Sequence, residues 1–388
     1  MGSGESSRQS RSFGARYRPV SLVSFELHGD VARRLSTLVS KNDCPHTLFY
    51  GPPGSGKKTL MLALLRELFG PGADRTHVET RPWKVQLPSR SIEIELTTVS
   101  SNHHVELNPS DAGNNDRYVV QELIRDMAAT RPVAAFAVEQ DEDGAGAGGG
   151  AASAPSSAPP VHRSFKVLLL DEVDRLSRDA QHALRRTMER YAGACRLMLR
   201  CESLSRVIEP LRSRCLCVRV PAPDEAAIEA RLGAVAALEG IAAPPALLRR
   251  VATQCGRNLR RALLALETLR ATNATLLPST PVPPVDWEAY VAEIARDARL
   301  EQSPRCLYLA RGKMYELLVN CVPPELVLRR LALELLARLD DELRQPLAAN
   351  AAKYEHRMQL GSKPIFHLEA FLARFLSDYK NYLVAAAA

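Results

Sequence analysis

The stretch that decides the fold is Leu48-Phe49-Tyr50-Gly51-Pro52-Pro53-Gly54-Ser55-Gly56-Lys57-Lys58-Thr59. The apolar run 47–50 predicts a short buried strand, and residues 60–69 carry apolar side chains at helical spacing. Between them, glycines let successive backbone N–H groups curl around a phosphate without side-chain clash. The helix N-terminus adds partial positive charge at the same point. A strand, a glycine-rich loop and a helix in this order predict a phosphate-binding P-loop.

The candidates for nucleotide contact in this loop are Gly51, Gly54, Ser55, Gly56, Lys57, Lys58 and Thr59. The Lys57 ammonium can reach the β- and γ-phosphates of a nucleotide. One position departs from the usual pattern, because Lys58 stands where serine or threonine is expected and Thr59 comes one residue late. The expected hydroxyl binds Mg²⁺, and successive helix residues point about 100° apart. The loop therefore predicts ATP or ADP and leaves it open whether Mg²⁺ accompanies the nucleotide.

A second buried strand ends in two carboxylates. Residues 165–170 form a near-continuous apolar run, typical of a buried parallel strand, and Asp171 and Glu172 follow it. Open α/β sheets bind ligands at the carboxyl ends of their strands, so the segment fits a Walker B element. Asp171 would hold Mg²⁺, directly or through water, and Glu172 would polarise the attacking water. The alternative is a strand followed by an acidic helix cap, but the upstream P-loop favours Walker B.

Length and composition exclude several classes of protein. The 388 residues predict two or three domains, and 46% hydrophobic with 24% charged residues is typical of a soluble globular protein. Lys plus Arg (51) exceeds Asp plus Glu (44), which permits an anionic partner without proving one. No apolar run approaches about 18 residues, so we expect no membrane contact. The scattered cysteines, none in Cys-x-x-Cys, indicate reduced intracellular thiols in the cytosol or nucleus.

The patterns divide the chain into one α/β part and two helical parts. Buried strands alternate with helical segments, which predicts a P-loop domain with a parallel sheet and flanking helices. Two segments are too poor in large apolar residues to order themselves, namely the arm 1–12 and the insertion 139–162. The expected boundaries are 13–222 for the α/β domain, 223–276 for a small helical domain, 277–285 for a proline-rich linker and 286–388 for an all-α C-terminal domain.

Two groups of basic residues each allow two interpretations. Tyr17 and Pro19 offer flat apolar surface beside the planar cation Arg18, which suits a surface arm or a clamp on the adenine side of a nucleotide. Residues 179–191 have an apolar face at helical spacing, with arginines lying elsewhere. A basic helix face is usually only solvated, and contacts to a phosphate backbone are the functional alternative. The candidates for such contacts are Arg117, Arg178, Arg185 and Arg186.

Several further runs can be compared with known families. Ser213-Arg214-Cys215 follows the Walker B element, and Arg260 and Arg261 lie together in the small helical domain. The most specific runs are Gly56-Lys57-Lys58-Thr59, Leu107-Asn108-Pro109-Ser110-Asp111-Ala112-Gly113-Asn114, Asp179-Ala180-Gln181-His182-Ala183-Leu184-Arg185-Arg186-Thr187-Met188-Glu189 and His367-Leu368-Glu369-Ala370-Phe371. In this order, from about Arg16 to Tyr379, they resemble the AAA+ clamp-loader small subunits of the replication factor C family.

The resemblance implies a function for the whole chain. It would be one of five subunits, with one large and three other small ones, in a nuclear, DNA-dependent ATPase complex. That complex opens a sliding clamp and closes it around primer–template DNA, which it contacts through phosphates. The two helical parts would be a lid and an oligomerising collar. Arg214 matches an arginine finger that reaches a neighbouring subunit's nucleotide. Arg260 matches a nucleotide-sensing arginine of the lid and is a better candidate than Arg261. Residues 17–19 match a segment that contacts the base of the nucleotide.

Whether the chain hydrolyses its own ATP depends on departures from that family pattern. Lys58 replaces a metal-binding hydroxyl, and Glu202 stands where many relatives place an asparagine that orients the attacking water. Loss of one such donor typically costs on the order of 10²–10³ in rate. We therefore expect tight nucleotide binding with slow or absent turnover; two lysines can neutralise a diphosphate, which suits retention of ADP, and retention of ATP is the alternative. The alternatives are a working ATPase subunit of the same complex, because Asp171 and Glu172 are both present, and a homo-oligomeric AAA+ motor acting on DNA junctions.

Overall fold

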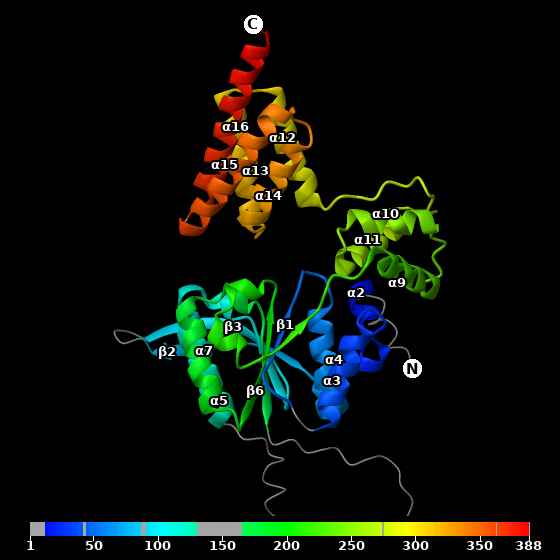
Figure 1. The fold of residues 1–388 in the computed structure, drawn as a ribbon, viewed down its shortest axis with the longest axis vertical. Helices are drawn as coiled ribbons and strands as arrows, with labels where there is room; N and C mark the ends of the chain where they lie inside the picture. The colour runs from blue at the N-terminus through cyan, green and yellow to red at the C-terminus, as the bar shows by residue number, and fades with distance from the viewer. Residues whose placement is uncertain are drawn as a thin grey trace, which may run out of the picture. The chain divides into compact units, whose positions relative to one another are not determined.

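The computed structural model describes residues 12–41, 44–86, 91–129, 165–273, 275–361 and 363–387. The insertion expected at 139–162 and all but the last residue of the expected arm 1–12 lie outside these ranges. The chain divides into two compact units, Met1–Val282 and Pro283–Ala388 (Figure 1). No helix in the described ranges combines the length and the apolar character that crossing a membrane requires.

In the described part of the first unit, seven strands form one sheet in the order β2-β3-β4-β5-β6-β1-β7. The strands from β4 to β7 along this order run parallel, which confirms the α/β fold predicted from the sequence. β2 and β3 extend the sheet as antiparallel strands, and β2 was not predicted. The bounds are β1 (Thr47–Tyr50), β2 (His77–Gln86), β3 (Ser91–Ser100), β4 (His104–Leu107), β5 (Lys166–Leu170), β6 (Cys195–Cys201) and β7 (Leu216–Arg219).

Helices cover both faces of this sheet (Figure 1). Alternate residues of a strand point to opposite faces, so β5 sends Leu168 and Leu170 to one core and Val167 and Leu169 to the other. The first core is closed by α5 (Asp116–Ala129), α7 (Arg178–Arg190) and α8 (Glu209–Arg212), and the second by α3 (Gly29–Ser40) and α4 (Lys57–Phe69). Short 3₁₀ turns lie at η1 (Leu22–Ser24), η2 (Gly70–Asp74), η3 (Pro109–Asn115), η4 (Val173–Arg175) and η5 (Leu204–Arg206).

The lid is a separate helical cluster within the first unit. It consists of α9 (Glu225–Leu238), α10 (Pro245–Gln254) and α11 (Leu259–Thr272), and the short helix α2 (Phe13–Arg16) packs against it. Phe13 is buried among the lid helices, and the Tyr17 hydroxyl donates to Glu239 Oε1 at 2.6 Å. Sequence reasoning grouped residues 13–17 with the α/β domain, whereas in the structure they lie on the lid.

The second unit is all-α. It contains α12 (Asp286–Leu300), α13 (Pro304–Val319), α14 (Pro324–Leu336), α15 (Asp341–Leu360) and α16 (Pro364–Ala387). The last helix carries apolar residues over much of its circumference, a pattern that suits either a domain core or a subunit interface. The structure places most of that surface in the core of the unit, where Leu368, Phe371 and Leu372 are buried against the other helices. Phe366 remains exposed on the same helix.

Candidate nucleotide-binding site

The P-loop connects β1 to α4 and depends on glycine at two positions. Gly51 has φ +150° and Gly54 has φ +73°. A Cβ atom on Gly51 would lie 2.0 Å from the carbonyl oxygen of Val220, and one on Gly54 would lie 1.8 Å from Asn258 Oδ1. The loop is therefore packed tightly between the end of β7 and the first turn of the lid helix α11.

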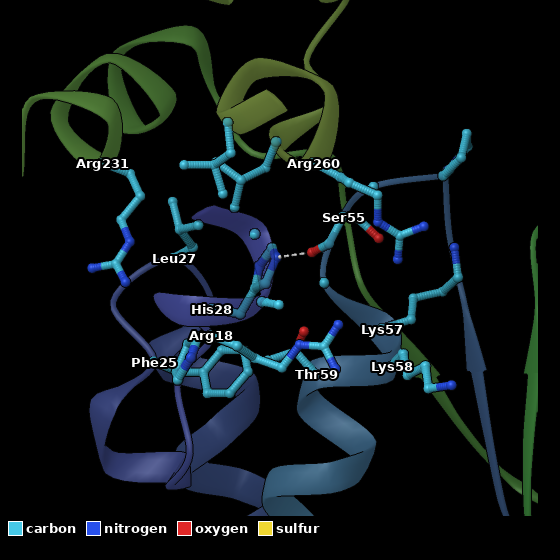
Figure 2. A pocket seen from close by; sticks show the side chains of 18 of the residues that line it. Arg18, Phe25, Leu27, His28, Ser55, Lys57, Lys58, Thr59, Arg231 and Arg260 are labelled. Atoms are coloured by element: carbon cyan, nitrogen blue, oxygen red, sulfur yellow. Dashed lines mark hydrogen bonds between the residues drawn. The ribbon is translucent and has the colours of Figure 1, made fainter. Parts of the chain in front are cut away.

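A cavity of about 350 Å³ lies between this loop, the N-terminal segment, the ends of β5 and β6, and the lid (Figure 2). All the nucleotide-binding residues predicted from the sequence line it, apart from Gly51 at the start of the loop. Glu172 and Glu202 line it as well. The predicted lining residues come from three separate parts of the chain and are Tyr17, Arg18, Pro19, Gly54, Ser55, Gly56, Lys57, Lys58, Thr59 and Arg260.

Lys57 begins helix α4 and is almost fully buried. Its Nζ donates to the carbonyl oxygens of Gly51 at 2.6 Å and Pro52 at 2.8 Å. Burial lowers the pKa of this ammonium, while the nearby carboxylate of Glu202 raises it. The loop carbonyls therefore hold the ammonium beside the backbone N–H groups at the N-terminus of α4, where a phosphate would be bound.

Two ion pairs lie next to Lys57. Lys58 Nζ pairs with Glu106 Oε1 from β4, and Arg200 Nε lies 2.9 Å from Asp171 Oδ1. Burial raises the pKa of Asp171; the Arg200 charge opposes that shift and Glu106 adds to it. Sequence reasoning did not single out Glu106 or Arg200. The only sequence signal for these two residues was their position near the carboxyl ends of β4 and β6. Parallel strands end at the same edge of a sheet, so residues at these ends lie near Asp171 at the end of β5.

The base side of the cavity carries two more cations. Arg18 and Arg260 both point into the cavity in Figure 2, and burial together with the Arg260 charge lowers the pKa of Arg18. The Nε atom of Arg18 is buried and has no hydrogen-bond partner among the described residues. His28, which sequence reasoning missed, donates from Nε2 to the carbonyl oxygen of Ser55 at 2.9 Å and so braces the P-loop. The positive charges of Arg18 and Arg260 repel each other, and an anionic ligand between the two guanidinium groups would relieve that repulsion.

Three carboxylates also line the cavity. Glu172 adopts a left-handed conformation with φ +55°, and its Oε2 lies 3.2 Å from an Arg175 Nη atom. Asp174 Oδ2 accepts hydrogen bonds from the backbone N–H groups of Glu202 and Ser203, each at 3.3 Å. Glu172, Asp174 and Glu202 thus all line the cavity, and the charges of Asp174 and Glu202 act on the ammonium of Lys57.

Arg214 does not line this cavity. It follows α8 at the exposed surface, where its Nε lies 2.6 Å from Glu189 Oε1 of α7 and its Nη1 donates to the Pro210 carbonyl oxygen at 2.9 Å. The hydrogen bond from Arg214 lowers the pKa of Glu189. The guanidinium is therefore anchored on its own chain and lies outside its own nucleotide site.

The arginines predicted to contact DNA lie at two neighbouring helices. Arg117 is in the first turn of α5 and Arg178 in the first turn of α7. Buried Asp116 links these helix starts, because its carboxylate accepts from Ser177 N at 2.7 Å and Ser177 Oγ at 2.9 Å. Farther along α7, Arg186 is exposed, whereas Arg185 is partly buried with Nε 3.6 Å from Glu189 Oε1. The structure thus brings Arg117 and Arg178 together and partly neutralises Arg185.

Comparison with known families identifies the helical parts. The family described as "Replication factor C subunit 3, C-terminal domain" matches residues 287–383. The family described as "RCF1/5-like, AAA+ ATPase lid domain" matches residues 230–271. Together these matches account for the lid helices and nearly all of the second unit.

Whole-chain relatives extend the comparison. Replication factor C subunit 3 of Arabidopsis thaliana is 51% identical over 95% of this chain and 98% of its own. Replication factor C subunit 5 of Oryza sativa is 50% identical over the same shares. Replication factor C subunit 3 of Homo sapiens is 44% identical over 95% of this chain and 96% of its own. Among solved structures, the Thermotoga maritima RuvB Holliday junction branch migration motor is 15% identical with a TM-score of 0.45, covering 72% of this chain and 78% of its own.

Proposed function

Because the chain belongs to the replication factor C subunit 3/5 family of AAA+ clamp-loader small subunits, we propose that it is a nucleotide-binding subunit of a heteropentameric clamp loader. Its partners would be one large and three other small replication factor C subunits, a sliding clamp and primer–template DNA, in the nucleus. The observation that carries nucleotide binding is the convergence of Arg18, Lys57, Lys58 and Arg260 on one cavity at the N-terminus of α4. Cations and a helix N-terminus together form a binding site for phosphates.

Slow or absent hydrolysis at this site follows from three side chains. Lys58, at the position of the metal-binding hydroxyl, is held by Glu106. Glu202 supplies a carboxylate where a donor would orient the attacking water, and Glu172 lies beside the charge of Arg175. Negative charge from Glu172, Asp174 and Glu202 on the wall of the cavity also disfavours a third phosphate, so ADP is the nucleotide we expect the chain to retain. The role of Asp171 as a Mg²⁺ ligand stays a prediction.

The chain would contribute to catalysis through Arg214 in its neighbour's site. A cation supplied in trans stabilises the charge that develops on the transferring phosphoryl group. The position of Arg214, exposed and outside its own cavity, supports this role. In the assembled complex, Arg214 would exchange its contact with Glu189 for the γ-phosphate of the adjacent subunit.

We expect Arg214→Ala to lower turnover at the neighbouring site by on the order of 10³-fold, whereas Glu172→Gln leaves clamp- and DNA-stimulated turnover of the complex within about twofold. The measurement is the rate of ATP hydrolysis by the reconstituted complex with each variant. Arg219→Ala, at an exposed arginine of β7, is the matched control. A clear loss of turnover in Glu172→Gln would instead establish a working ATPase at this site.

Binding to DNA is proposed for the basic residues around the starts of α5 and α7, namely Arg117, Arg178, Arg185 and Arg186. We expect the double variant Arg178→Glu, Arg186→Glu to weaken binding of primer–template DNA by the assembled complex, without base preference. A plot of the logarithm of the association constant for DNA against the logarithm of salt concentration should become less steep. Its slope should change by about one for each DNA phosphate that the protein no longer neutralises. Arg34→Glu, at an exposed arginine of α3 on the opposite face of the sheet, is the matched control. Unchanged affinity and slope in the double variant would leave these arginines without a DNA role.

A further inference from the structure

The region beneath the P-loop contains two cations and two carboxylates in contact. Lys58 comes from the first turn of α4, Glu106 from β4, Asp171 from the end of β5 and Arg200 from β6. The Lys58–Glu106 and Arg200–Asp171 pairs lie side by side, because β4, β5 and β6 are neighbours in the sheet and the charges of Glu106, Arg200 and Lys58 all act on the pKa of Asp171. All four side chains are mostly buried, so water screens these charges only partly.

The family to which the chain belongs implies Mg²⁺ at this place, but the residues do not fit it. A P-loop nucleotidase holds Mg²⁺ with a hydroxyl oxygen of the P-loop and the Walker B aspartate. Lys58 has three N–H donors and no lone pair to offer a metal. Asp171 Oδ1 already forms an ion pair with Arg200, 2.9 Å from its Nε, and Glu106 forms one with Lys58. A divalent cation would have to displace one guanidinium and lie against an ammonium.

The charges of the four residues already balance. In a site with a hydroxyl in place of Lys58 and no arginine beside Asp171, the two carboxylates would carry an uncompensated negative charge, which a divalent cation neutralises. Here Lys58 and Arg200 supply two positive charges of their own. Arg200 also lines the cavity, and its ion pair with Asp171 is formed at Nε, so the Nη donors of the guanidinium are not the atoms that face this carboxylate. Its Nη donors can therefore reach an anion in the cavity.

We propose that Arg200 and Lys58 together replace the divalent cation, so that this site binds a nucleoside diphosphate that carries no metal. The inference rests on the proposed function of the chain as a nucleotide-binding subunit and defines the chemical form of the nucleotide. Arg200 is in this view a specificity-determining residue. It binds the phosphates in place of the metal and withdraws Asp171 from metal coordination.

The test is titration calorimetry of the full chain with ADP, once in Mg²⁺ and once in EDTA. For the wild-type chain we expect the two Kd values to agree within about twofold, a free-energy difference of about 0.4 kcal/mol. The double variant Lys58→Thr, Arg200→Ala restores a hydroxyl and releases Asp171, and it should bind ADP at least tenfold more tightly in Mg²⁺ than in EDTA. Arg200→Lys keeps a cation at Asp171 and should remain independent of Mg²⁺. Arg206→Ala, at an exposed arginine, is the matched control.

The wild-type comparison decides the proposal even if a variant does not fold. ADP binding that weakens tenfold or more in EDTA would overturn the role of Arg200 and Lys58 as a replacement for the metal and leave nucleotide binding intact. No ADP binding in either buffer, by the chain or by the assembled complex, would overturn the proposed nucleotide site itself. A second readout is the ADP that remains on the complex after gel filtration in EDTA, which we expect to equal the amount retained in Mg²⁺.

Discussion

Replacing Gly54 with alanine should lower the affinity of the full chain for ADP by at least about 100-fold, equivalent to about 2.7 kcal/mol. Gly54 has φ +73°, a region that costs an L-residue about 1–2 kcal/mol. The added Cβ would also lie 1.8 Å from Asn258 Oδ1. That oxygen caps helix α11 by accepting from the Arg261 N–H at 3.1 Å, so it cannot move aside without cost.

As long as Asn258 keeps its capping hydrogen bond, the clash can be relieved in only two ways, and both damage the site. Either the P-loop withdraws from the phosphates, or the first turn of α11 moves and takes Arg260 with it. Calorimetry with ADP measures the loss, and Gly193→Ala is the matched control, since a Cβ there meets no atom within 4 Å. Adding Asn258→Ala to the Gly54→Ala chain should recover part of the affinity by removing the obstructing amide. Wild-type affinity in Gly54→Ala would show that the lid and the P-loop are not in contact in solution.

The second large effect is expected in the all-α unit, where Phe371→Ala should lower the free energy of unfolding by about 3–5 kcal/mol. Phe371 is 0% exposed, and its ring packs edge-on against Tyr354 of α15 with centroids 6.2 Å apart. Truncation leaves a cavity between α15 and α16 that the surrounding helices fill only partly. Because the chain has two units, hydrogen exchange of the amides in α16 is the measurement that isolates this one.

Phe366→Ala is the matched control for this prediction. Phe366 is on the same helix but 53% exposed, so its truncation should change the free energy of unfolding by about 0.5 kcal/mol or less. Faster exchange in Phe371→Ala alone supports a packed core along α16. Equal effects of the two substitutions would mean that burial in this unit does not govern its stability.

The elements that the sequence predicted well are those with strong local constraints. β5 is buried on both faces, which requires an apolar run, and the P-loop requires glycines at fixed positions. β2 escaped prediction because it is an edge strand that holds Pro82 and charged residues. Proline is tolerated at an edge, where one side of the strand has no hydrogen-bonding neighbour. A pattern typical of a loop is therefore compatible with a strand at that place.

Sequence reasoning also predicted the residues that line the cavity more readily than it predicted their neighbours. Lys58 was noticed because it breaks a local motif, but its partner Glu106 is 48 residues away. Arg200 becomes significant only when β6 is known to lie next to β5, which is a property of the sheet order. The packing of Phe13 in the lid is equally non-local, because its N–H donates to Glu267, 254 positions away. Such pairings depend on tertiary structure, which periodicity within a segment does not encode.

The position of α2 on the lid has a mechanical consequence. The chain passes from lid to sheet between Phe13, in the lid core, and Leu22, in the core of the α/β part. It returns between Val220 and Ile228. The lid is thus connected to the sheet by two stretches of chain, and a body held at two points turns about the line that joins them. We therefore expect the lid to turn about one axis rather than to swivel freely, and so to open and close the cavity in a single direction.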